Sequence, residues 1–227
     1  MKIISMTRHS LAATLLAALT AMTAACTQDV YDKGDSELSL MRADFVEAHV
    51  GPDKRVDYVT TDDDIQLPLT TPFTTSWIQQ ADTTYRAVLY YNYTDRQAEP
   101  LSLARVSTTS IHRPANFKGG AKTDPLGLES VWVSTNRRYL NLCVILKTGT
   151  ADEKAEAQTV GIIGDTIVTA PSGQRTYHLR LYHNQGQVPQ YYSQRVYFSV
   201  PIHGLPADSL RLTVNTYDGP VTKAFSL

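Results

Sequence analysis

The sequence predicts an all-β protein, in which a small barrel is followed by an antiparallel β-sandwich. The chain contains 13 Tyr and is rich in Thr and Val, and no long stretch has the helical spacing of apolar residues. Short segments of alternating apolar and polar residues recur along the chain, and a stretch dense in Gly and Pro divides them into two groups. The roughly 200 residues after the N-terminal leader are enough for two small β-domains.

Residues 1–25 have the pattern of a signal peptide. Lys2 and Arg8 form a charged start, and residues 11–25 are an apolar stretch of Leu, Ala, Thr and Met. A membrane-spanning helix needs roughly 20 apolar residues, so this shorter stretch predicts export rather than a permanent transmembrane anchor.

Cys26 is the predicted site of lipid attachment. Small residues stand directly before it, as in a bacterial lipobox, although Thr23 occupies the place where the usual pattern has Leu or another large aliphatic residue. Acyl chains, each worth about 0.8 kcal/mol per buried methylene, would hold the protein on a membrane. The alternative is an ordinary secretory leader, whose removal leaves Cys26 as a free thiol.

Residues 26–36 are expected to form a polar tether behind the lipid. Its acids Asp29 and Asp32 are a thin version of a surface-export signal, so an outer-membrane location is predicted and the face, periplasmic or surface, is left open. Removal of Lys2 and Arg8 with the leader leaves 19 of the 21 basic residues against 22 acidic ones. The net charge is then near −3, which argues against nucleic acid as a partner.

Residues 37–112 are predicted to form the barrel from about five strands. Apolar and polar residues alternate over 56–58 and again over 65–69, and the acidic residues 62–64 between them indicate a hairpin turn. Pro68 has no backbone N–H, so we expect its strand at an edge or in an open barrel. Five antiparallel strands of this length suit a small barrel.

Residues 113–128 are dense in Gly, Pro and polar residues and are predicted to be the linker between the domains. The sandwich is predicted over 129–227, where seven strand patterns follow one another. In SLRLTVN (209–215), Leu210, Leu212 and Val214 share one face, as expected when that face packs in the core and the other faces water. Cys143, in YLNLCVILK, is expected to pack like a small hydrophobic residue.

The order of these parts resembles the NigD-like lipoproteins of Bacteroidota. The resemblance rests on the lipobox, the polar tether, the five-strand segment and the sandwich motifs NRRYLNLCVILKT, TYHLRLYHNQGQ and DSLRLTVNTYDGP. It implies an OB-like barrel followed by a β-sandwich on an exported, membrane-anchored protein. The family's link to a bacteriocin gene cluster suggests immunity or envelope defence, but no catalytic or binding residues are carried over.

An aromatic group in the predicted barrel is a candidate ligand surface. OB-like barrels use exposed aromatic residues to stack bases or sugars, and Trp77, Arg86 and Tyr90 are the candidates here. Alternation places Tyr90 on the same strand face as Arg86, whereas Tyr85, Tyr91 and Tyr93 share the other face. The second set is expected on the core side of the barrel.

Two clusters are weak candidates for metal sites. The carboxylates of Asp62, Asp63 and Asp64 could help to hold a cation such as Ca²⁺, although turn chemistry explains the triplet as well. His178 and His183 are the closest His pair, but five residues apart on a strand they point to opposite faces. We therefore expect them to be polar residues at the surface or rim rather than zinc ligands, and no cofactor is predicted.

The sequence offers no convergent catalytic group. The segment GDSEL at 34–38 resembles the nucleophile block of some esterases, but no His in the chain has Asp three residues before it, as those enzymes require. We therefore expect a non-enzymatic envelope protein, anchored through Cys26, that binds an envelope protein or a glycan. The alternatives are a role in a surface assembly through edge-strand pairing, in which residues 219–227 would take part, and a hydrolase with a site scattered over loops.

Overall fold

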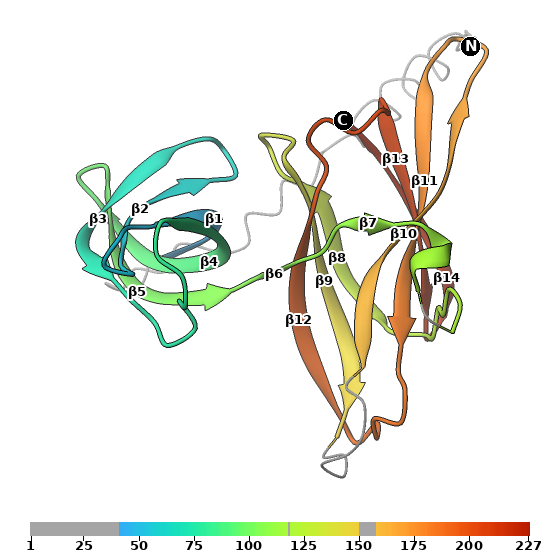
Figure 1. Ribbon diagram of the computed structural model, residues 1–227, viewed down its shortest axis with the longest axis horizontal. Coiled ribbons are helices and arrows are strands. Elements are labelled where there is room, and N and C mark those ends of the chain that lie inside the picture. The colour runs from blue at the N-terminus through green and yellow to red at the C-terminus, as the bar shows by residue number, and fades with distance from the viewer. Residues whose placement is uncertain (1–40, 118, 150–157) are drawn as a thin grey trace, which may run out of the picture. The chain divides into compact units, whose positions relative to one another are not determined.

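The computed structural model describes residues 41–117, 119–149 and 158–227, and its strands form a closed barrel and two further sheets (Figure 1). This confirms the predicted all-β class. The predicted signal peptide, Cys26, the tether and the GDSEL segment lie outside the described residues. Within those three ranges, no helix is long and apolar enough to cross a bilayer.

The barrel has the strand order β1-β2-β3-β5-β4, and β4 pairs back onto β1. A five-stranded barrel of this kind is the architecture expected of an OB-like domain. Its strands are β1 (Met41–Val50), β2 (Val56–Thr61), β3 (Gln66–Phe73), β4 (Thr83–Thr94) and β5 (Gln97–Arg105).

The predicted hairpin between β2 and β3 is confirmed, with Asp64 in its turn at a φ of 59°. The expectation that Pro68 lies at an edge or in an open barrel is wrong, because the barrel is closed. Pro68 stands opposite Tyr58 in the β2–β3 pair, and β3 meets β5 through the single pair Leu69–Ala98. A strand with one missing N–H is accommodated where so little pairing is required.

The aromatic face predicted to point inward does so. Leu89 and Tyr91 are buried, and Tyr85 and Tyr93 pack against the barrel core. The Tyr91 hydroxyl donates a hydrogen bond of 2.6 Å to Asp44. Burial of Tyr91, with this bond as a second cause, raises the pKa of its phenol.

The chain leaves the barrel sheet after Arg105. The next two short strands, β6 (Ser107–Thr108) and β7 (Ile111–His112), pair in parallel with strands β12 and β10 of the sandwich. A short 3-10 helix, η2 (Pro114–Asn116), follows.

The sandwich consists of a five-stranded sheet with the order β14-β13-β11-β10-β7 and a four-stranded sheet with the order β6-β12-β9-β8. The seven predicted strands are all present, and Leu210, Leu212 and Val214 lie in the core between the sheets. The seven strands are β8 (Gly127–Val133), β9 (Tyr139–Thr148), β10 (Thr159–Thr169), β11 (Arg175–Asn184), β12 (Tyr192–Pro201), β13 (Ser209–Thr216) and β14 (Gly219–Ser226).

Candidate functional site: the junction of barrel and sandwich

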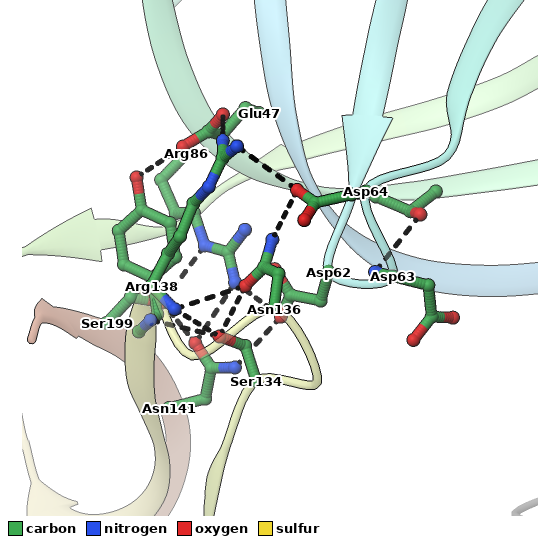
Figure 2. A network of polar contacts seen from close by, with 12 residues as sticks. Glu47, Asp62, Asp63, Asp64, Arg86, Ser134, Asn136, Arg138, Asn141 and Ser199 are labelled. Atoms are coloured by element: carbon green, nitrogen blue, oxygen red, sulfur yellow. Dashed lines mark hydrogen bonds and ion pairs between the residues drawn. The ribbon is translucent and has the colours of Figure 1, made fainter. Parts of the chain in front are cut away.

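A buried arginine lies at the centre of a polar cluster between the barrel and the sandwich (Figure 2). Arg86 Nη2 donates to Asp62 Oδ2 at 2.7 Å and to Asn141 Oδ1 at 3.1 Å, and Nε donates to Ser199 Oγ at 3.2 Å. Arg86 lies on β4 and Asp62 in the turn after β2. Asn141 on β9 and Ser199 on β12 are opposite each other in register, so the sandwich sheet presents both groups to the arginine together.

The cluster is almost sealed from solvent. The side chain of Arg86 is 1% exposed and that of Asp62 is 17% exposed. The guanidinium lies 4.1 Å from the ring centroid of Tyr139 and 5.4 Å from that of Phe45, close enough for cation–π attraction. A buried ion pair needs further hydrogen bonds to offset the loss of hydration, and Asn141 supplies one by donating to Asp62 Oδ2 at 3.0 Å. Arg86 Nη1 and Asp62 Oδ1 are buried without a hydrogen-bond partner among the described residues.

A second arginine, Arg138, connects the two domains at the rim of the cluster. Arg138 forms ion pairs with Glu47 at 3.0 Å and with Asp64 at 3.1 Å. The backbone N–H of Asn136, in the turn between β8 and β9, donates to the Asp62 carbonyl at 2.8 Å. The β2–β3 turn of the barrel is therefore bound by side-chain and backbone contacts to the β8–β9 turn of the sandwich.

Aromatic rings complete the junction. Phe45 on β1 makes edge-to-face contacts with Trp132, at 5.2 Å between centroids, and with Tyr197, at 5.7 Å. The Tyr139 hydroxyl donates to Glu47 at 2.8 Å. Burial, together with this bond to a carboxylate, raises the pKa of Tyr139 to about 12.

The three candidate ligand residues of the barrel do not form one exposed surface. Trp77 packs edge-to-face on Tyr85 and donates its indole N–H to the Leu103 carbonyl at 3.2 Å. Arg86 is buried in the junction, and Tyr90 is half-buried on β4. The sandwich covers the barrel face on which Arg86 lies.

The three side chains of the acidic triplet point in different directions. Asp62 and Asp64 point toward Arg86 and Arg138, whereas the exposed Asp63 carboxylate points away from both (Figure 2). Two of the three carboxylates are therefore paired with arginine. In the part of the chain that the structure describes, no three His, Cys, Asp or Glu side chains are grouped so as to hold a metal ion.

His183 is buried, so its expected place at the surface or rim is wrong. Its ring nitrogens lie 3.0 Å from the Asp124 carbonyl and 3.2 Å from Gln158 Oε1. The segment that leads into β8 covers it, since the backbone groups of Lys122 and Asp124 bond to those of His183. His178, half-buried, lies on the opposite face of β11 as predicted from strand alternation.

Cys143 is buried in β9 and 1% exposed, as expected for a packed thiol. Burial raises its pKa above the ordinary value, with the nearby Glu129 carboxylate as a second cause. A nucleophilic thiol needs the opposite shift.

A cleft of about 490 Å³ opens beside the junction. Glu47, Arg86 and Tyr139, which are already engaged in the junction, form part of its wall, and Arg105 and Ser107 form another part. Its volume is within the range of small-molecule sites.

Sequence reasoning missed most of the residues that build this site. Glu47, Asn136, Arg138 and Asn141 carry no motif, and the strand alternation that places Asn141 on the outer face of its sheet does not say what covers that face. Chemically, the arrangement joins two domains. Arg86 of the barrel bonds to Asn141 and Ser199 of the sandwich, and Arg138 of the sandwich forms ion pairs with Glu47 and Asp64 of the barrel.

Neither a scan of protein-family models nor a search of curated proteins gave a match. A NigD-like immunity protein from Bacteroides caccae ATCC 43185 has a similar structure, with a TM-score of 0.59 and 19% identity over 86% of this chain and 99% of that chain.

Two further solved structures are similar over most of the chain. A protein proposed to be toxin-related, from Parabacteroides distasonis ATCC 8503, has a TM-score of 0.61 and 20% identity over 82% of this chain and 93% of that chain. A proposed lipoprotein from Bacteroides fragilis NCTC 9343 has a TM-score of 0.56 and 13% identity over 82% and 96%. The resemblance to NigD-like proteins is thus confirmed for the fold: this chain has the barrel-and-sandwich fold of the Bacteroides caccae protein.

Proposed function

We propose that this protein is an exported lipoprotein, anchored through Cys26, with a non-catalytic binding role in the cell envelope. The observation that carries the proposal is the set of hydrogen bonds that Arg86 makes within the chain. Two nitrogens of this buried cation, Nη2 and Nε, are bonded to Asp62, Asn141 and Ser199 within the chain, and the third, Nη1, is buried without a hydrogen-bond partner among the described residues. We infer that the junction fixes how the two domains are presented to a partner, which is an envelope protein or a glycan.

The anchor is tested by detergent partition. The full chain and its Cys26→Ala variant are expressed in a bacterium that processes lipoproteins, and membranes are dissolved in a detergent that separates into two phases on warming. The wild-type chain is expected in the detergent phase, because acyl chains contribute about 0.8 kcal/mol per buried methylene. The variant is expected in the aqueous phase; equal partition of the two chains would contradict the anchor.

Immunity is a second candidate role, favoured by the structural similarity to the NigD-like immunity protein of Bacteroides caccae. Its test is survival of a sensitive strain that expresses the full chain and is exposed to culture fluid of bacteriocin-producing relatives. Protection by the wild-type chain and its loss with Cys26→Ala would support an anchored immunity protein. Survival no better than that of the empty strain, against every fluid tried, would argue against it.

A further inference from the structure

The outer half of β10 is exposed on both faces. Residues 165–169, with the sequence DTIVT, are all exposed, although a strand within a sandwich buries every second residue. The preceding residues Ile162 and Ile163 are fully buried. The β10–β11 hairpin therefore extends past the sandwich core, as Figure 1 shows.

One edge of this outer half has no neighbouring strand among the described residues. Strand β11 pairs with it on one side, from Thr166 to Thr169. On the other side β7 pairs only with Ile162 and Ile163, and within the described residues no strand continues along 165–169.

The backbone groups at this edge can be assigned from the ladder. The Ala170 N–H donates to the Gln174 carbonyl at 2.8 Å. In an antiparallel pair, hydrogen-bonded and non-hydrogen-bonded positions alternate. Val168 therefore bonds to β11, whereas Ile167 and Thr169 turn their N–H and C=O groups toward the open edge.

This edge has little of the usual protection against pairing. Natural edge strands carry Lys or Pro, contain a bulge or are covered. DTIVT has no Lys or Pro, and its register shift lies at its first residue, Asp165, so that 166–169 form a regular strand. Its acid, Asp165, is neutralised by Arg180, which donates two hydrogen bonds of 2.7 Å to it. Ile167 is 37% exposed and Val168 is 48% exposed, so β-branched apolar side chains accompany the free backbone groups.

We propose that this edge pairs with the same edge of a second copy of the chain, antiparallel and about a two-fold axis at Ile167. The order of side chains is self-complementary: Ile167 faces Ile167 of the second copy, Thr166 faces Val168, and Asp165 faces Thr169. No like charges oppose each other, and one surface serves both copies, as two-fold symmetry requires. Five residues a side cover far less than the roughly 800 Å² per partner of a stable dimer, so the pairing is weak and depends on concentration.

Cysteine cross-linking of the full chain in membranes tests the proposal. Opposed residues in a hydrogen-bonded pair have Cα atoms about 5.5 Å apart, within the range that a disulfide spans. Ile167→Cys is therefore expected to form a disulfide dimer on mild oxidation, visible on a non-reducing gel. Val168→Cys is the matched control, because Val168 faces Thr166 and not itself, and the unaltered chain shows any dimer formed through its own cysteines.

The expected result is roughly tenfold more dimer for Ile167→Cys than for Val168→Cys, because only the first thiol meets its own copy across the axis. Random collision predicts the reverse order, since Val168 is the more exposed of the two. Equal cross-linking, or more with Val168→Cys, would overturn the proposal. Absence of a dimer with Ile167→Cys would also overturn the proposal, because it would indicate that another protein or residues 1–40 occupy the edge.

A backbone variant separates pairing from folding. Thr169→Pro removes an N–H that faces the open edge and is not used by β11, so the hairpin should fold as before. Introduced beside Ile167→Cys, it should reduce the dimer to the level of the Val168→Cys control while the urea midpoint stays unchanged. Undiminished cross-linking in this double variant would contradict the paired strands.

Discussion

Replacement of Arg86 by Met should destabilise the protein more than any other single charge removal at the junction. Met has a similar length and keeps the packing against Tyr139, but it leaves the Asp62 carboxylate without its buried cation. Removal of one partner of a buried ion pair costs about 3–5 kcal/mol. Because the Asp62 side chain is 17% exposed, water recovers part of its solvation, and we expect about 3 kcal/mol.

Urea unfolding of the chain without residues 1–25 measures this cost. With a slope of about 2 kcal/mol per molar urea, a loss of 3 kcal/mol lowers the midpoint by roughly 1.5 M. The two tryptophans, Trp77 in the barrel and Trp132 in the sandwich, report on the two domains when each is replaced in turn by Phe. In the parent chain the two transitions should coincide, and in Arg86→Met they should separate.

Two further variants make the result interpretable. Arg180→Met breaks an exposed ion pair with Asp165 and should cost less than about 1 kcal/mol. The double variant Arg86→Met with Asp62→Leu removes both charges and should recover most of the loss, because replacing a whole buried pair by apolar residues is often close to neutral. An Arg86→Met midpoint no lower than that of Arg180→Met, or a double variant no more stable than Arg86→Met, would refute the reasoning.

Four other changes have expected outcomes. Gly164→Ala should cost about 1–3 kcal/mol in urea, because the added methyl would clash with the Tyr177 hydroxyl and lie 2.7 Å from Ile111; an unchanged midpoint would contradict this. Burial lowers the pKa of His49 below 6.5, so its contribution to stability is complete above pH 6.5 and is lost as the pH falls through the folded-state pKa; His49→Gln should flatten that part of the stability–pH curve. The pKa of Tyr139 is raised to about 12, so its contribution is present below pH 10 and lost toward pH 12, and the 295 nm titration of Tyr139→Phe should lack one late phenolate. Cys143 should react with a thiol reagent at the rate of unfolding, because it is buried with a raised pKa; fast labelling of the native protein would contradict its packing.

The strands could be predicted because their signal is local. Alternation in SLRLTVN determines which residues face the core, and Leu210, Leu212 and Val214 are buried as this pattern indicates. The hairpin at Asp62–Asp64 is equally local, since acidic turn residues separate two alternating runs. Closure of the barrel was not predicted. Pro68 lacks an N–H for strand pairing, but the sequence does not show that β3 and β5 pair through a single residue pair, which makes that N–H unnecessary.

The junction could not be predicted because its partners are distant in sequence. Arg86 lies 113 residues from Ser199 and 55 residues from Asn141, and nothing near Arg86 in the chain indicates that its strand face is covered. His183 is a different case, because it shares its strand face with Leu179 and Leu181, which lie in the core. Alternation thus indicates an inward position, and its buried polar partner, the Asp124 carbonyl, lies 59 positions earlier. A polar residue on an outward strand face is buried when another element of the fold packs on that face.

The measurement that tests the proposed function most directly is metabolic labelling of living cells with a palmitate analogue, combined with protease shaving. We predict that the wild-type chain is labelled, that Cys26→Ala loses the label, and that shaving removes the wild-type protein from intact cells. Label with resistance to shaving would keep the anchor but place the protein on an inner face of the envelope. Label retained in Cys26→Ala, or absent from the wild-type chain, would contradict the lipid anchor on which the proposed function depends.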